Sequence, residues 1–290
     1  MAEYSLATSM WGSDQAFDDV IAGVAAAGFD QCELAAWMNL EDQLTAGDRR
    51  RSLNRHGVSA RTVHPQIANV DLSALDDEIR TRSVSIVGGC LESSAELGGF
   101  AAIIHPTGAD TSREEDVEAR IAAFRRSLDT LVEQAEQIGI RLACENLQLK
   151  GEPRPLCRMA ELRAVVDEYS PTVGICLDTG HANNNALEPA EEARIAGHRL
   201  IAIHLQDTDG IEDRHWVPGT GSIQWHRLHA ALREIQFRGA WTLELKAHDA
   251  SPADVASAAR RIADAWEAGR FPSGNEDDPV SENDEETLDS

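Results

Sequence analysis

Short runs of apolar residues alternate along the chain with longer stretches in which apolar residues recur every three or four positions. The first pattern predicts buried strands, and the second predicts helices that cover them. Strands are expected at approximately 4–9, 31–34, 59–63, 101–104, 141–145, 173–178, 200–205 and 240–245. Helices are expected near 14–27, 40–55, 74–97, 113–138, 158–169, 188–196, 225–236 and 253–267. Eight strand–helix repeats predict an α/β fold, a single closed (β/α)8 TIM barrel; a doubly wound open sheet, the alternative, lacks its glycine fingerprint here.

The stretch 113–138 carries the clearest helical pattern, with apolar residues at three- and four-residue spacing from Val117 to Ala135. Ser112 and Glu115 are spaced as a capping box, which predicts where this helix begins. Gly139 follows the last apolar position and predicts where it ends.

Four apolar runs in the second half of the chain each end in a residue that can bind a metal ion. These residues are Glu145, Asp178, His204 and Glu244, at intervals of 33, 26 and 40 residues. Each interval leaves room for one helix and two loops, so the four residues are expected to end four consecutive strands of the barrel. Three carboxylates and one imidazole that converge on one point would repel one another without a cation, and this ligand set suits Mn²⁺, Mg²⁺, Co²⁺ or Zn²⁺. The alternative is a set of unrelated polar residues at strand ends.

Other polar residues stand at or just beyond the same ends of the strands. His64 and His105 end the third and fourth strands, and Glu33, near the end of the second, is expected to orient one of them. Beyond the sixth strand, His181 is a candidate for a second metal or for a substrate hydroxyl, or else a helix-capping or loop histidine. The remaining candidates follow the seventh strand: Asp207, which binds substrate or else forms a turn, and Arg214 and His215 in a loop with Gly219 and Gly221, whose small size allows close approach to a ligand.

Composition limits the partners of the protein. The formal net charge is −24, from 50 acidic and 26 basic residues, which disfavours a nucleic-acid partner and resembles proteins adapted to high salt; a moderately acidic protein with an acidic tail is the alternative. The five cysteines are odd in number and form no CxxC pair, so no disulfide framework or zinc ribbon is expected.

The ends of the chain predict one catalytic domain without a membrane anchor. We expect residues 1–270 to form the barrel and 271–290 to be a disordered acidic tail, since 273–290 hold eight acidic residues and no basic one. No run of about 18 apolar residues occurs and the N-terminus lacks a signal-peptide pattern, so a cytoplasmic protein with no membrane partner is expected.

Five segments of the chain resemble the xylose isomerase-like barrel superfamily, and more closely its sugar phosphate isomerase/epimerase group, which includes the ketose 3-epimerases. The segments are Glu145-Asn146, the run from Leu177 to His181, the run from Ile203 to Asp207, the loop from His215 to Trp225, and the run from Glu244 to Lys246. The resemblance covers about residues 4–267. It implies a small-molecule sugar as substrate and an assembly that is often a dimer or tetramer.

The resemblance also assigns roles to residues. It implies that Glu145, Asp178, His204 and Glu244 hold one divalent metal and that Glu145 and Glu244 also act as acid and base. Proton transfer through an enediolate of a free or phosphorylated sugar is the expected reaction. His181 is implied to touch substrate; further candidates for substrate binding are Asn146, His64, His105, Asp207, Arg214 and His215.

Three alternatives remain within or beside this superfamily. An endonuclease IV type of trinuclear zinc nuclease would use His64, His105, Glu145, Asp178, His181, His204, Asp213, His215 and Glu244. Against it stand Leu147-Gln148-Leu149 after the Glu-Asn pair, the lack of an arginine-rich loop after the second strand, and the acidic surface. The other two are a lyase of the inosose dehydratase type and a barrel that only binds a ligand.

Overall fold

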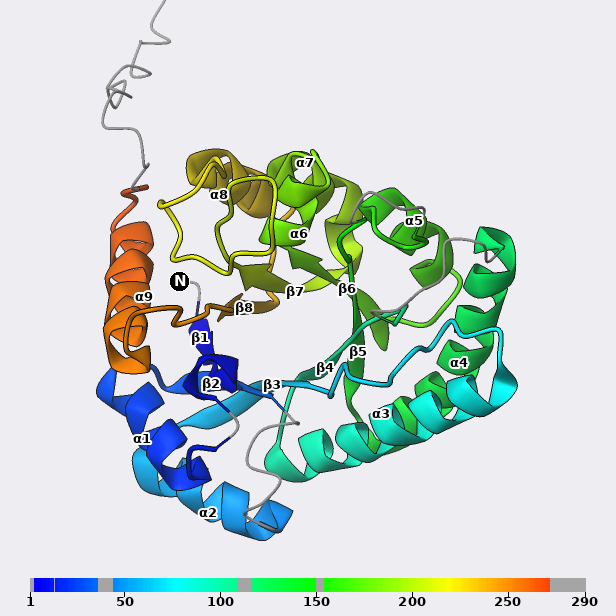
Figure 1. Ribbon diagram of the computed structural model, residues 1–290, viewed down its shortest axis with the longest axis horizontal. Coiled ribbons are helices and arrows are strands. Elements are labelled where there is room, and N and C mark those ends of the chain that lie inside the picture. Colours follow the sequence, from blue (N-terminus) through cyan, green and yellow to red (C-terminus); the bar gives the residue numbers. More distant parts are fainter. Residues whose placement is uncertain (1–2, 13, 36–43, 109–115, 150–153, 272–290) are drawn as a thin grey trace, which may run out of the picture.

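The computed structural model describes residues 3–12, 14–35, 44–108, 116–149 and 154–271. Eight parallel strands close into one barrel in chain order, with β8 pairing with β1, so the predicted (β/α)8 TIM barrel is confirmed (Figure 1). The predicted tail lies outside the described residues beyond Phe271. The strands are β1 (Tyr4–Ala7), β2 (Gln31–Ala35), β3 (Ser59–His64), β4 (Ala101–Ile104), β5 (Arg141–Glu145), β6 (Val173–Asp178), β7 (Leu200–Leu205) and β8 (Ala240–Leu243).

Helices surround the barrel as an outer ring (Figure 1). They are α1 (Phe17–Ala26), α2 (Ala46–His56), α3 (Asp77–Leu97), α4 (Val117–Ile138), α5 (Met159–Val166), α6 (Thr179–Asn184), α7 (Pro189–Ala196), α8 (Trp225–Glu234) and α9 (Pro252–Glu267). Two 3-10 turns, η1 (Thr8–Trp11) and η3 (Gly197–Arg199), precede α1 and β7.

The boundaries of the long helix α4 are set by residues that cap its two ends. The long helix α4 begins at Val117 rather than 113, because Asp116 accepts hydrogen bonds from the backbone N–H groups of Glu118 and Ala119. The predicted capping box of Ser112 and Glu115 lies outside the described residues. At the other end, Gly139 has φ 75°, a left-handed conformation that closes the helix at the expected place.

The strands carry two sets of apolar residues on alternate positions. One set packs with the helices into a large core, and the other forms a separate cluster that includes Ala101, Ala143, Ala202 and Ala240. Because successive strand residues point to opposite faces, this second, small-residue cluster belongs to the barrel interior. The interior is therefore packed, and the polar residues at the carboxyl ends of the strands lie above a solid base.

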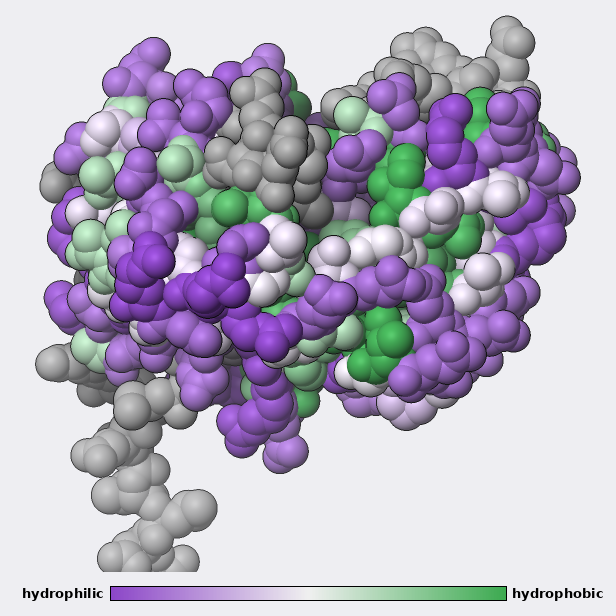
Figure 2. All heavy atoms as spheres, turned by 90° about the horizontal axis from the view of Figure 1, so that it is seen from below, coloured by the Kyte–Doolittle hydropathy of each residue, from purple (hydrophilic) through white to green (hydrophobic). Residues whose placement is uncertain are grey.

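The described residues agree with two further expectations from composition. All five cysteines are buried and unpaired by disulfides. No helix among the described residues is long and apolar enough to cross a membrane. Hydrophilic residues predominate on the face drawn in Figure 2, where hydrophobic residues show mainly in recesses.

Candidate metal centre

The four residues expected to share a cation come together at the carboxyl end of the barrel. Glu145 and Asp178 are the last residues of β5 and β6, His204 is the penultimate residue of β7, and Glu244 directly follows β8. One ligand atom from each lies within 4.8 Å of the others. Parallel strands of a closed barrel bring their carboxyl ends to one face, which is why residues about 100 positions apart in the chain meet here.

His204 lies at the middle of this group. Its Nδ1 atom is 3.1 Å from Oε2 of Glu244, 3.6 Å from Oε2 of Glu145 and 4.0 Å from Oδ2 of Asp178. His204 Nδ1 and Glu145 Oε2 are buried and have no hydrogen-bond partner among the described residues. Buried polar atoms are rarely left in this state, and a divalent cation at this point would satisfy both.

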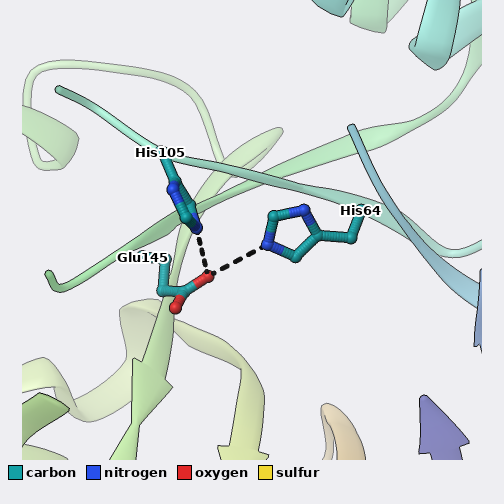
Figure 3. A group of neighbouring side chains, drawn as sticks. All are labelled: His64, His105 and Glu145. Carbon is teal, nitrogen blue, oxygen red and sulfur yellow. Dashed lines mark ion pairs between the residues drawn. The ribbon is translucent and has the colours of Figure 1, made fainter. Parts of the chain in front are cut away.

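Two further histidines contact Glu145 from the other side. The Nε2 atoms of His105 and His64 are 3.3 and 3.6 Å from Oε2 of Glu145 (Figure 3). His64 donates through Nδ1 to the carbonyl oxygen of Pro65 at 2.8 Å, so in its neutral form Nε2 is left without a proton. His64, His105 and Glu145 thus form a second group with the geometry of metal ligands.

A third cluster joins His181, Asp213 and His215. Asp213 lies between the two imidazoles, with Oδ2 3.0 Å from Nε2 of His215 and Oδ1 3.8 Å from Nε2 of His181. His181 Nδ1 is 3.2 Å from Oε1 of Glu145 and donates to the backbone carbonyl of Asn146 at 2.9 Å. The first two clusters therefore share Glu145, and the third contacts Glu145 through His181.

The short helix α6, which the sequence pattern did not predict, positions His181. Asp178 caps this helix by accepting a hydrogen bond from the backbone N–H of His181 at 2.7 Å. The same carboxylate thus ends β6, starts α6 and faces the candidate metal position. Aspartate is a preferred residue at the start of a helix, so Asp178 at the end of its strand was a signal that could have revealed this helix.

Glu33 contacts a different histidine from the ones expected. It was expected to orient His64 or His105, but its Oε2 lies 3.1 Å from Nε2 of His204 and accepts a hydrogen bond from Thr62 at 2.7 Å. Glu33 is only 2% exposed. A charged residue inside the apolar run Cys-Glu-Leu-Ala was a visible signal, but its partner depends on which strands face each other across the barrel.

Asp207 and Arg214, expected to bind substrate, are engaged elsewhere. The buried carboxylate of Asp207 accepts hydrogen bonds from the backbone N–H groups of Thr208, Gly219 and Ile223 and from Nε1 of Trp225. It therefore organises the loop between β7 and α8.

The guanidinium of Arg214 pairs with Asp209 and Glu212 and lies over the ring of Trp216. It therefore belongs to the same loop rather than to the metal centre. Gly221 serves the loop as well, because a Cβ atom there would come within 2.3 Å of Asp207 Oδ1. The lack of a side chain at Gly221 therefore lets the backbone lie close to Asp207, whereas the sequence suggested close approach to a ligand.

Asn146, also expected to bind substrate, joins two strands instead. Its side chain donates to the carbonyl oxygen of Asp178 at 3.1 Å and accepts from the N–H of Asp178 at 2.7 Å. Both polar ends of the buried amide are therefore used to fix the end of β6 beside the end of β5.

The pKa values of the site reflect this crowding of charges. Burial alone would raise the pKa of Glu145, but the imidazoles of His105 and His204 hold it well below its ordinary value. At Glu244 burial again favours a higher pKa, but the neighbouring His204 lowers the pKa to about 2. Burial raises the pKa of Asp178 to about 6, whereas His204, despite burial, has a pKa well above 6.5 because carboxylates surround it. In the metal-free protein, protons on the imidazoles therefore balance the buried carboxylates.

Comparison with known proteins defines the class of the protein. A family model described as xylose isomerase-like TIM barrel matches residues 21–265. The chain belongs to this family.

Several curated relatives and solved structures are sugar epimerases. D-psicose 3-epimerase of Agrobacterium fabrum is 28% identical over 235 residues, 79% of this chain and 78% of that protein. L-ribulose 3-epimerase of Methylomonas sp. (strain DH-1) is 27% identical over 77% of this chain and 76% of its own length. A solved structure of L-ribulose 3-epimerase shares the fold, with a TM-score of 0.80 and 19% identity over 91% of this chain and 94% of that chain.

Other relatives match over shorter stretches. Among the first relatives, the match spans 64% of an uncharacterized protein of Methanocaldococcus jannaschii and 43% of D-psicose 3-epimerase of Enterocloster bolteae, less than two thirds of either. A probable endonuclease 4 of Thermoplasma acidophilum is 24% identical over 60% of this chain and 63% of its own length.

Proposed function

We propose that the protein is a divalent-metal-dependent isomerase or epimerase of a small sugar. The observation that carries the proposal is the convergence of Glu145, Asp178, His204 and Glu244, with ligand atoms within 4.8 Å of one another at the carboxyl end of the barrel. The sugar epimerases among its relatives, two of which match more than three quarters of the chain, support the same class of substrate.

Glu145, Asp178, His204 and Glu244 would hold the cation. Mn²⁺, Mg²⁺, Co²⁺ or Zn²⁺ bound there supplies a Lewis acid that stabilises negative charge developing on a carbonyl oxygen of the sugar. Nδ1 of His204 and Oε2 of Glu145 support this ligand set, because both are buried, neither has a hydrogen-bond partner among the described residues, and their ion-pair contacts are with other groups of the site.

Glu145 and Glu244 are the proposed proton-transfer groups. Glu145 is buried and Glu244 largely so, and the histidines around them keep their pKa values low, so each is ionised and able to accept a proton at neutral pH. One removes the proton α to the sugar carbonyl, which gives a planar enediolate. For epimerisation the other carboxylate, after it has taken up a proton from solvent, delivers that proton to the opposite face; for isomerisation the first carboxylate returns the abstracted proton to the adjacent carbon.

Deuterium exchange tests this assignment. Protein loaded with Mn²⁺ and incubated in D2O with D-psicose, D-fructose, D-tagatose and L-ribulose should place deuterium on the carbon next to the carbonyl of its substrate. Glu244→Gln should slow that exchange by about 100-fold or more, since it removes a general acid–base group. Glu133→Gln, which changes an exposed acid on α4, away from the site, is the matched control.

Metal content must be measured in the same samples. If Glu244→Gln retains wild-type Mn²⁺ and exchange continues at the wild-type rate, Glu244 is not an acid–base group. If no ketose or aldose in a broad panel exchanges deuterium with any of the four metals, the proposed activity is wrong.

A second candidate function is phosphodiester hydrolysis at abasic sites in DNA. The observation that favours it is the presence of two more potential ligand clusters beside the first, His64 with His105 and His181 with Asp213 and His215. A probable endonuclease 4 is among the relatives. The acidic composition disfavours DNA binding and ranks this candidate second.

Metal stoichiometry separates the two candidates. One bound ion per chain and no cleavage of abasic DNA support the sugar enzyme. Three zinc ions per chain, together with nicking of a duplex that contains one abasic site, support the nuclease.

A further inference from the structure

A cavity opens beside the metal centre at the carboxyl end of the barrel. Its volume is about 680 Å³, and it lies between the segment after β5, the end of α6 and the loop between β7 and α8. Gln148, Asn184, Asn185, Ile211, Glu212 and Asp213 line it.

Asp213 connects this cavity to the metal centre. One side of its carboxylate contacts His181 at 3.8 Å, and His181 in turn lies 3.2 Å from Glu145. The cavity therefore begins one side chain away from the proposed acid–base group. His181 thus lies between the lining of the cavity and Glu145.

Two amide groups at the cavity have unused hydrogen-bonding capacity. Nε2 of Gln148 and Nδ2 of Asn184 are buried and have no hydrogen-bond partner among the described residues. The orientation of the Asn184 amide is fixed, because its Oδ1 accepts a hydrogen bond from the hydroxyl of Thr208 at 2.8 Å. Buried donors without partners are unfavourable, so these two groups favour a ligand that brings acceptor oxygens.

Asn185 holds the segment that carries Gln148. Its Oδ1 accepts from the backbone N–H of Leu149 at 2.8 Å, and its Nδ2 donates to the carbonyl of Leu147 at 2.9 Å. Gln148, which is 7% exposed, is thus fixed between two anchored neighbours. This Leu-Gln-Leu segment is the one that departs from the nuclease pattern in the sequence.

The charges around the cavity are unsuited to a phosphate group. No basic side chain is among the described residues that line it, whereas Glu212 and Asp213 are acidic. The cations next to them are already paired: Arg214 with Asp209 and Glu212, and Lys246 with Asp213 at 3.7 Å. A phosphate would face two carboxylates, and the described basic side chains beside the cavity are already paired.

We propose that this cavity binds the hydroxylated end of an unphosphorylated sugar, with Gln148 and Asn184 donating hydrogen bonds to its hydroxyl oxygens. Hydroxyl groups accept such bonds without bringing charge, and exposed Ile211 offers an apolar contact for the carbon skeleton. The inference rests on the proposed sugar chemistry and adds the class of substrate: free sugars rather than their phosphate esters.

Paired substrates give the first test. Full-length protein loaded with Mn²⁺ is assayed for binding by calorimetry, and for deuterium exchange, with D-fructose and D-psicose and with D-fructose 1-phosphate and 6-phosphate. Each phosphate ester should bind at least tenfold more weakly than the free sugar. A phosphate ester that binds as tightly as its free sugar, or more tightly, overturns the proposal.

Substitutions at the amides give the second test. Gln148→Leu keeps the size of the side chain and removes its donor, and Asn184→Asp keeps the acceptor for Thr208 and removes the donor. Each should raise KM for free sugars by about tenfold with little change in kcat, because groups that bind the substrate equally in its ground and transition states affect KM. Affinity for Mn²⁺ should remain at the wild-type value. Gln31→Leu, at the opposite end of the barrel, is the control for replacing a glutamine.

The outcomes separate this proposal from the proposed function. Free-sugar binding that the two variants weaken, without deuterium exchange in any variant, supports the cavity and contradicts the proposed reaction. If deuterium exchange occurs and both variants keep the wild-type KM for the sugar, the proposed reaction is supported and sugar binding in the cavity is contradicted. The two donors would then be satisfied by water alone.

Discussion

At the scale of single residues, His204 is the side chain on which most contacts of the site depend. Its Nε2 atom faces Glu33 at 3.1 Å and its Nδ1 atom faces Glu244 at the same distance. A carboxylate on one nitrogen fixes the tautomer, so that the other nitrogen is free to bind a metal. Thr62 holds Glu33 in turn, so two buried groups lie in a chain behind one proposed ligand.

Replacing Glu33 by Gln should weaken Mn²⁺ binding about 10- to 100-fold, the usual effect of removing a partner behind a metal-binding histidine. The fold should persist, because Gln is similar in size to Glu. Calorimetric titration of the metal-free protein measures the change, with Glu3→Gln at the other end of the barrel as the control. Unchanged affinity would mean that Glu33 does not orient His204.

Metal affinity should also depend on pH. His204 has a pKa above 6.5 in the metal-free protein and Asp178 has one of about 6, so both carry protons that a metal must displace. Apparent affinity should therefore rise with pH between about 5 and 8, by roughly tenfold per pH unit for each proton released. Titrations with Mn²⁺ at pH 6, 7 and 8 test this.

The same protons affect the stability of the metal-free fold. A pKa raised on folding gives stability that is fully present below the unfolded value and lost as pH rises through the folded value. For His204 this means full stabilisation below about 6.5 and a decline above it. The increase in Tm on adding Mn²⁺ should thus be larger at pH 8 than at pH 6; an equal increase at both would contradict proton displacement.

At the scale of elements, the loop between β7 and α8 is held by one buried carboxylate. Asp207 accepts three backbone hydrogen bonds and one from Trp225, and its own backbone pairs with Trp216. This loop carries Asp213 and His215 to the metal centre. The cluster of His181, Asp213 and His215 therefore depends on this loop being well ordered.

Asp207→Ala should lower the free energy of unfolding by about 3 kcal/mol, because it leaves several buried donors without an acceptor. It should also increase cleavage by proteases between Asp207 and Trp225. Chemical denaturation and limited proteolysis measure the two effects. Asp209→Ala, at a partly exposed residue of the same loop, should cost less than about 1 kcal/mol; equal costs for the two would refute the organising role of Asp207.

At the scale of the whole molecule, the formal net charge of −24 is the dominant electrostatic feature. Arginines pair with many of the acids, as Arg125 does with Glu168 and Arg199 with Asp167. The excess of acidic groups nevertheless leaves net repulsion, which salt screens over about 10 Å at 0.1 M and over shorter distances at higher concentration.

Raising KCl from 0.1 to 1 M should therefore increase Tm, by roughly 5 °C for a domain of this size. Sucrose, which stabilises by exclusion and not by screening, serves as the comparison. A Tm that falls with KCl would show that the surface ion pairs outweigh the general repulsion.

The sequence by itself determined the barrel and the four residues at the centre of the candidate site. Buried parallel strands produce apolar runs, and the residue that ends each run lies at the shared carboxyl face, so the positions of Glu145, Asp178 and His204 follow from local pattern alone. The strands β4, β5, β6 and β7 have the expected bounds, and most expected helices are found within a few residues of theirs. The helix α4 starts later because Asp116 caps its first turn, and the short helix α6 was not expected.

Only the tertiary structure decided which partner each polar residue meets. The pairing of Glu33 with His204 depends on the relative positions of β2 and β7 across the barrel, and the burial of Asp207 depends on how a long loop folds back on itself. Contacts of this kind join residues far apart in the chain, and strand periodicity carries no information about them. The side chains expected to bind substrate at Asn146, Asp207 and Arg214 are for this reason the ones that the structure assigns to the scaffold.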